Sequence, residues 1–140
     1  MSVATFCRIH ADQQIPHRLD AVGRGWHPLL TRLHTRLAAL DPEYRLEELT
    51  PKLGGLRIYV ADRFGADGEF DGAWADTVAQ LADEAAVEAE RTCELCGAPG
   101  RPRFHGDHRA TWIRTVCTGC RDAPHPGGGP GRPLGSRFPR

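Results

Sequence analysis

Four cysteines in the last third of the chain have the spacing of a metal site. Cys93 and Cys96 form one C-x2-C pair, twenty residues follow, and Cys117 and Cys120 form a second pair. A two-residue gap lets one tight turn direct two thiolates at the same ion, and zinc favours four such ligands in a tetrahedron. Gly97 follows the first pair, where a residue free to adopt a positive φ helps the turn to close. The spacing therefore predicts one structural zinc ion held by all four thiolates.

Two disulfides are the competing interpretation of these cysteines. Disulfide frameworks are typical of secreted proteins, and no apolar run of signal-peptide length follows Met1. No apolar run approaches the ~20 residues of a membrane-spanning helix either. We therefore expect a reduced, cytoplasmic, zinc-binding protein. Cys7, the odd fifth cysteine, is expected to be a small buried or idle thiol.

The formal charge of the chain is zero but unevenly distributed. Residues 1–90 hold nine Arg and Lys against fifteen Asp and Glu, whereas residues 91–140 hold nine Arg against three acidic residues. A basic module beside an acidic body either binds an anionic partner or is attracted to the body itself. If it binds nucleic acid, the expected surface consists of five arginines and one tryptophan of the cysteine-rich module, Arg101, Arg103, Arg109, Trp112, Arg114 and Arg121.

The residues that precede this module predict two helices with a hairpin between them. Trp26 and the leucines after it repeat at helical spacing over 25–40. A second helix is expected over 71–91, with Asp71 as a possible N-cap and a buried stripe of Trp74, Val78, Leu81 and Ala85.

Strands are expected at 44–50 and 56–60, because apolar and polar residues alternate in the second run. Pro51 and the pair Gly54-Gly55 lie between these runs and supply turn chemistry. Two further strands are expected at 101–104 and 110–116.

Together these elements predict an α+β fold: two helices packed on a small antiparallel hairpin, followed by a four-cysteine zinc ribbon. We expect a partly ordered arm at 1–24, a helix–hairpin–helix body at 25–91, the zinc-ribbon module at 92–121 and a disordered tail at 122–140. The tail is rich in Pro, Gly and Arg, a composition that cannot form a core.

Four stretches, in order along the chain, carry a resemblance. They are G-W-H-P-L at 25–29, K-L-G-G-L-R-I-Y-V at 52–60, C-x2-C-G-x-P-G at 93–100 and W-I-R-T-V-C at 112–117. Over residues 25–120 the chain resembles a family of small uncharacterised proteins of phages, prophages and bacteria, in which Leu53 is usually Phe and Val116 usually Leu. The resemblance implies an α/β body with a zinc knuckle, and it implies no known activity.

The segment between the two cysteine pairs has a second resemblance. His105-x-Asp107-His108 is similar to part of the HNH endonuclease motif, in which His108 would act as general base and Asp107 would contact a divalent metal. The chain departs from that family, because only eight residues separate His108 from Cys117 and no histidine directly follows Cys120.

We therefore expect a non-catalytic zinc-binding protein that acts as a binding or adaptor module on a protein partner. The alternative is a nucleic-acid-binding zinc ribbon with a basic tail, and the lesser alternative is a degenerate HNH-type nuclease. The sequence indicates no membrane association and no small-molecule substrate. It leaves open the identity of the partner and whether His105 or His108 contacts the metal.

Overall fold

The computed structural model describes residues 13–106 and 111–123 of the 140-residue chain. Two short 3-10 helices come first, η1 (Ile15–Ala21) and η2 (Arg24–Trp26), followed by helix α2 (His27–Leu40). The strands β1 (Leu46–Lys52) and β2 (Gly55–Val60), helix α3 (Gly72–Ala89), and the strands β3 (Arg101–Gly106) and β4 (Thr111–Val116) follow in order. Each strand pair forms an antiparallel two-stranded sheet. The α+β class with two small hairpins is thus confirmed for the described residues.

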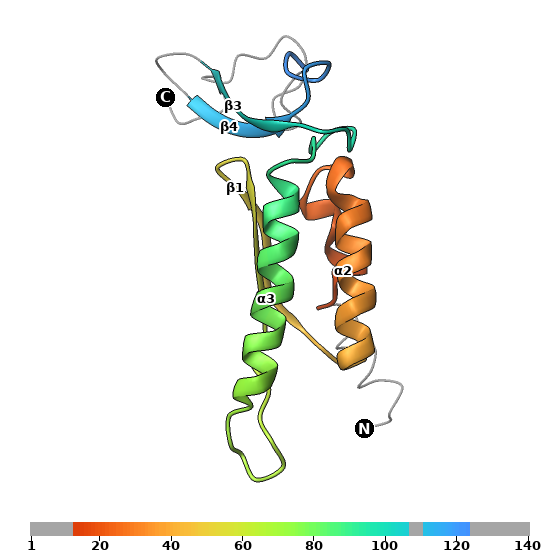
Figure 1. The fold of residues 1–140 in the computed structure, drawn as a ribbon, viewed down its shortest axis with the longest axis vertical. Coiled ribbons are helices and arrows are strands. Elements are labelled where there is room, and N and C mark those ends of the chain that lie inside the picture. Colours follow the sequence, from red (N-terminus) through yellow and green to blue (C-terminus); the bar gives the residue numbers. More distant parts are fainter. Residues whose placement is uncertain (1–12, 107–110, 124–140) are drawn as a thin grey trace.

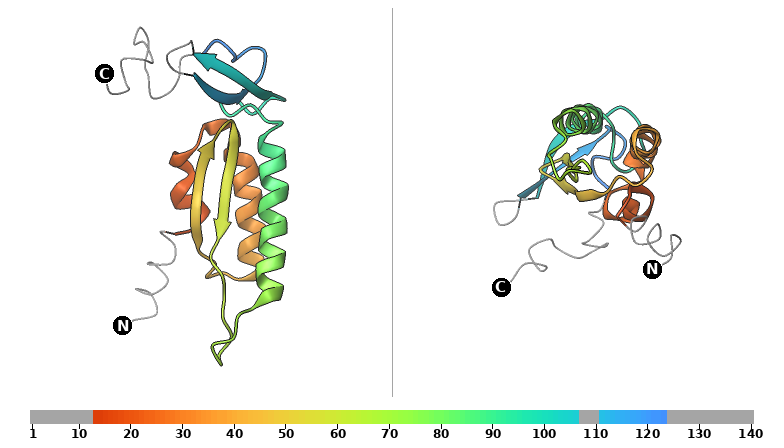
Figure 2. Two further views of the ribbon diagram at one scale, coloured as in Figure 1. Left: turned by 90° about the vertical axis from the view of Figure 1, so that its left-hand side faces the viewer. Right: turned by 90° about the horizontal axis from the view of Figure 1, so that it is seen from below.

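The molecule is elongated, and the β3–β4 hairpin lies across one end of it (Figure 1). Helices α2 and α3 run beside each other and pack against the β1–β2 hairpin (Figure 2). The loop between β2 and α3 projects from the end opposite β3–β4. Within the described ranges, no helix has the length and apolar character needed to cross a membrane.

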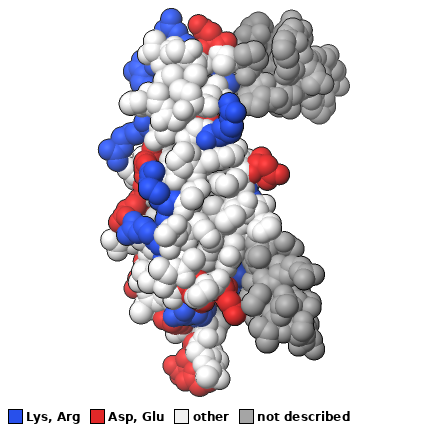
Figure 3. Space-filling model, turned by 90° about the vertical axis from the view of Figure 1, so that its right-hand side faces the viewer, with Lys and Arg blue, Asp and Glu red and all other residues white. Residues whose placement is uncertain are grey.

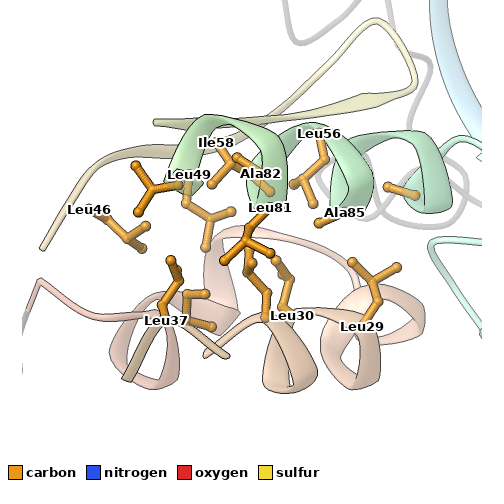
Figure 4. Packing of buried hydrophobic residues seen from close by; sticks show 14 of the residues in the cluster. Leu29, Leu30, Leu37, Leu46, Leu49, Leu56, Ile58, Leu81, Ala82 and Ala85 are labelled. Atoms are coloured by element: carbon orange, nitrogen blue, oxygen red, sulfur yellow. The ribbon is translucent and has the colours of Figure 1, made fainter. Parts of the chain in front are cut away.

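The core fills the space between the two helices and the inner face of the first hairpin (Figure 4). Leu30 and Leu37 of α2 and Leu49 of β1 are fully buried. The stripe predicted for α3 is also buried along its whole length, at Trp74, Val78, Leu81 and Ala85. The periodicity of the sequence therefore marks the faces that meet in the core.

Helix α3 begins where the sequence predicts. The Asp71 carboxylate accepts a hydrogen bond from the Trp74 backbone N–H at 2.9 Å, which confirms Asp71 as the N-cap. This hydrogen bond, together with the Arg63 guanidinium, lowers the pKa of Asp71. Arg63 also binds Asp41 and lies over the Trp74 ring, 4.4 Å from its centroid. These contacts hold the base of the loop before α3 against both helices.

Part of the expected N-terminal arm is packed against the body. Ile15 is fully buried, and its N–H donates to the Tyr44 hydroxyl at 3.1 Å. The same hydroxyl lies 2.7 Å from Nδ1 of His34 in α2. Burial raises the pKa of Tyr44 to about 12. The described residues of the arm, 13–24, thus belong to the core: Ile15 and Val22 are buried in it, and Leu19 packs against it.

The turn of the first hairpin is shorter than the sequence suggests. Pro51 lies within β1 and pairs with Leu56, and Gly55 already belongs to β2. The turn consists of Leu53 and Gly54, whose φ angles of 54° and 78° are both positive. A two-residue loop of this kind matches the twist of the flanking strands. Leu53 pays a steric cost there, because its Cβ disfavours the left-handed region.

We expect Leu53→Asn to raise the free energy of unfolding by about 1 kcal/mol, because Asn adopts the left-handed region more readily. The Leu53 side chain is 72 % exposed, so its loss removes little burial. Urea unfolding of the metal-loaded protein measures the change. Leu53→Ala keeps the strain and serves as the control. A midpoint for Leu53→Asn no higher than that of Leu53→Ala would contradict this explanation.

Candidate metal centre

The four predicted cysteines lie together. The Sγ atoms of Cys93, Cys96, Cys117 and Cys120 are all within 4.8 Å of one another, and those of Cys96 and Cys117 are 3.6 Å apart. Zinc–sulfur bonds near 2.3 Å in a tetrahedron place the sulfur atoms about 3.8 Å apart, whereas a disulfide requires about 2.0 Å. All four residues are free thiols in the structure. The donor set therefore fits a tetrahedral metal ion.

Two tight turns aim the thiols at a common point. In the first, the Cys93 N–H donates to Ala98 O at 2.7 Å, and the Gly97 N–H donates to Cys93 O at 2.9 Å. Gly97 has a φ of 86°, the left-handed conformation that its position after the pair predicts. In the second, the Cys120 N–H donates to Cys117 O at 3.2 Å.

The protein environment shifts the pKa values of Cys93 and Cys120 in opposite directions. Burial raises the pKa of Cys93, but backbone N–H groups of Cys117, Cys96 and Leu95 outweigh burial and lower it to about 7. The hydrogen bond with the Cys117 thiol is the main cause that raises the pKa of Cys120 to about 12. Four thiolates can therefore coexist near neutral pH only when a cation balances their charge. Metal binding must release protons and weaken as the pH falls.

The first cysteine turn rests directly on the backbone of residues 23–25. The Gly25 N–H donates to Glu94 O at 2.8 Å. A Cβ atom at Gly25 would lie 1.9 Å from Cys93 O, and one at Gly23 would lie 2.2 Å from Glu94 O. No side chain fits at either position, so glycine is what permits the contact between body and cysteine turn.

Trp26 joins the same turn to the end of α3. Its indole N–H lies 3.1 Å from Ala89 O and 2.9 Å from Thr92 O, and the side chain is fully buried. Backbone carbonyls at the end of a helix have no partner within the helix. The tryptophan therefore satisfies a helix end and fixes the point at which the chain enters the first cysteine turn.

The tip of the first hairpin contacts β4. The Thr115 hydroxyl donates to Gly54 O, and a Cβ atom at Gly54 would lie 2.6 Å from the Ile113 side chain. On the cysteine side, the Thr115 N–H donates to Oε1 of Glu94 at 3.0 Å, and the Glu94 N–H donates to Thr115 O at 2.9 Å. Burial raises the pKa of Glu94. Thr115 thus bridges the hairpin tip and the first cysteine turn.

We call these contacts the junction; it comprises residues 23–26, 54, 89–97 and 113–115. It includes residues of the segments 25–29, 52–60, 93–100 and 112–117. From the sequence, Gly54 was expected only to supply turn chemistry, and no packing role was expected for Gly23 or Gly25. The signal available in the sequence was the segment Gly23-Arg24-Gly25-Trp26, which lies immediately before helix α2.

The structure brings together three of the arginines expected to bind nucleic acid. Arg101, Arg103 and Arg121 line a hollow of about 440 Å³ along β3, together with Pro102, Phe104, His105 and Asp122. We call this hollow the β3 hollow. Its positive charge is reduced by Asp122, whose carboxylate lies 3.7 Å from the Arg121 guanidinium.

The other members of that expected surface are placed differently. Arg114 is 3 % exposed, and its guanidinium donates to Ala123 O at 2.7 Å. Trp112 is half-buried and stacks on His105, with ring centroids 5.8 Å apart. Arg109 lies outside the described residues. Burial removes the Arg114 side chain from the surface, and the histidine covers part of the Trp112 ring.

His105 contacts backbone carbonyls. Its Nδ1 lies 3.1 Å from Arg103 O and its Nε2 lies 2.8 Å from Arg121 O. Both ring nitrogens therefore lie within hydrogen-bonding distance of backbone carbonyl oxygens, which fixes the orientation of the ring. In the described part of the chain, the group of possible metal ligands around the cysteines contains no histidine. Asp107 and His108 lie outside the described residues.

Comparisons with protein-family models, with curated proteins and with solved structures find no match to this chain. The cysteine cluster, the junction and the β3 hollow are the features that indicate a function.

We expect Gly25→Ala to weaken metal binding at least tenfold, on the order of other changes to residues that support metal ligands. The added methyl group collides with Cys93 O and displaces the turn that carries two of the thiols. Competition against a chromophoric zinc chelator measures the affinity.

Gly72→Ala is the matched control, because a Cβ atom at Gly72 meets only the Phe70 ring, at 3.9 Å. Wild-type affinity in Gly25→Ala would show that the close contact does not support the metal site.

Proposed function

We propose that this protein is a non-catalytic zinc-binding protein, in which a structural zinc ion fixes the β3–β4 hairpin to the end of the body as a binding surface. The observation that carries the proposal is the set of four thiols at tetrahedral spacing. Soft thiolate donors favour zinc over magnesium or calcium. Four thiolates also fill the coordination shell of zinc, so no position remains for a reacting water molecule.

Protein purified under reducing conditions is expected to contain about one zinc ion per chain. Elemental analysis of wild type and Cys117→Ser measures the content, and the variant should lose the metal because one of four ligands is missing. Cys7→Ser, which changes the cysteine outside the cluster, should retain it. Absence of zinc from the wild type, or full zinc content in Cys117→Ser, would contradict the proposal.

Nucleic acid is the ligand that the β3 hollow fits best. Arg101, Arg103 and Arg121 border it, and guanidinium groups bind phosphate oxygens through paired hydrogen bonds. Three phosphate contacts support weak binding that depends on salt and little on sequence.

We expect the triple variant Arg101→Gln/Arg103→Gln/Arg121→Gln to lose binding to a fluorescent oligonucleotide, measured by anisotropy at low salt. The control Arg32→Gln/Arg36→Gln/Arg45→Gln removes the same charge from the body and should bind nearly as well as wild type. Equal losses in the two variants would mean that only net charge matters.

The same incubations test the nuclease alternative. We expect the oligonucleotide to remain intact in the presence of magnesium. Cleavage by wild type that disappears in His108→Ala would favour an HNH-type enzyme instead.

A protein partner is the second candidate, and the loop between β2 and α3 favours it. Phe64 and Phe70 at this loop are 59 % and 55 % exposed, with ring centroids 5.9 Å apart. Acidic side chains gather at its tip (Figure 3), where Asp67 and Glu69 are exposed. Exposed aromatic anchors with a polar rim are typical of protein interfaces.

The protein partner would be identified by mass spectrometry after capture, and binding would then be measured with the purified pair. Phe64→Ser/Phe70→Ser should abolish that binding, whereas Leu40→Ser, which changes an exposed leucine of α2, should not. Equal binding by both variants would exclude the loop as the docking element.

A further inference from the structure

Phe104 is the most exposed of the large apolar side chains in the described ranges, at 77 %. It lies in β3 between Arg103 and His105 and borders the β3 hollow. Successive residues of a strand point to opposite faces, so the phenyl ring and the Arg103 side chain lie on either side of the same strand. β3 pairs only with β4 in the described part of the chain, which leaves its outer edge beside the hollow.

This placement puts the aromatic ring across a single strand from two arginine side chains. Arg101 and Arg103 share one face of β3, and Arg121 reaches the hollow from the segment after the second cysteine turn. A nucleic-acid backbone that follows the edge of β3 can meet these cations while one of its bases covers the phenyl ring. Trp112, which the sequence indicates as the stacking residue, is half-buried and stacks on His105.

We infer that the β3 hollow binds single-stranded nucleic acid in preference to duplex, with an unpaired base stacked on Phe104. The inference rests on the proposed nucleic-acid function and specifies its ligand. The faces of paired bases are covered by their neighbours in the duplex, so a side chain can stack fully only on an unpaired base. The arginines bind the phosphates of both forms, and the phenyl ring supplies the difference.

The test compares a fluorescent oligo(dT) of about fifteen nucleotides with a duplex of the same length, using the full-length zinc-loaded protein at low salt. We expect Phe104→Ala to weaken single-strand binding about tenfold and to leave duplex binding unchanged. Phe104→Tyr keeps an aromatic ring and should restore single-strand binding. Tyr59→Ala removes an exposed aromatic side chain of β2 and should bind both probes as wild type does.

Failure of the inference and failure of the proposed function give different results. No binding of either probe by wild type would overturn both. Duplex binding at least as tight as single-strand binding would overturn the inference alone. The inference alone would also be overturned if Phe104→Ala weakened binding to both probes equally. The same holds if Phe104→Ala left the affinity for the single strand unchanged. Zinc content is measured in every variant, so that loss of the metal site is recognised as such.

Discussion

The contact between Gly25 and the carbonyl oxygen of Cys93 is the constraint on which the metal end of this protein depends. Two segments of backbone meet there at a distance that leaves no room for a Cβ atom. A two-stranded hairpin alone is marginally stable in water, and few residues of β3 and β4 are buried. The proposed metal ion would join the two cysteine turns, and the junction seats the first turn on the body.

The two ends of the molecule are stabilised by different physical means. The body has an ordinary core of leucines from α2, α3 and the first hairpin. The cysteine end has thiols, glycine contacts and hydrogen bonds, among them those from Trp26 and Thr115. Structural zinc supplies roughly 10–16 kcal/mol in small zinc modules at neutral pH, and an ion held by the four thiols as proposed would compensate for the small amount of apolar burial. Loss of the metal should consequently loosen one end and spare the other.

Local features of the sequence were sufficient to predict the helices, the N-cap at Asp71 and the grouping of the four cysteines. Helical stripes and C-x2-C spacing encode contacts between residues that are near one another in the chain. The turn at Leu53 and Gly54 was misplaced, because leucine seldom adopts a positive φ and proline seldom lies within a strand. Ile15, Leu19 and Val22 have helical spacing, but Pro16, Gly23 and Gly25 interrupt this stretch, so its packing against the core was not predicted.

The candidate nucleic-acid-binding surface at the β3 hollow could be predicted only in part, because it depends on contacts between residues that are distant in the chain. Arginine is usually a surface residue. Arg114 is nevertheless buried, and its guanidinium donates a hydrogen bond to Ala123 O, in the segment that follows the second cysteine turn. A single phenylalanine in a strand usually faces a core, so the exposure of Phe104 was not predicted. Among the residues that the structure describes, no second sheet packs on that side of the hairpin. Both outcomes depend on how separate segments meet, which residue spacing does not specify.

Amide hydrogen exchange with the metal bound, and again after its removal, tests the central claim most directly. If the metal seats the hairpin through the junction, chelation should remove protection from the amides of Gly25, Cys93 and Thr115. The amides of Leu33 in α2 and Val78 in α3 should remain protected, because the core does not depend on the metal. Unchanged protection at Gly25, Cys93 and Thr115 after elemental analysis has verified metal removal would contradict the account.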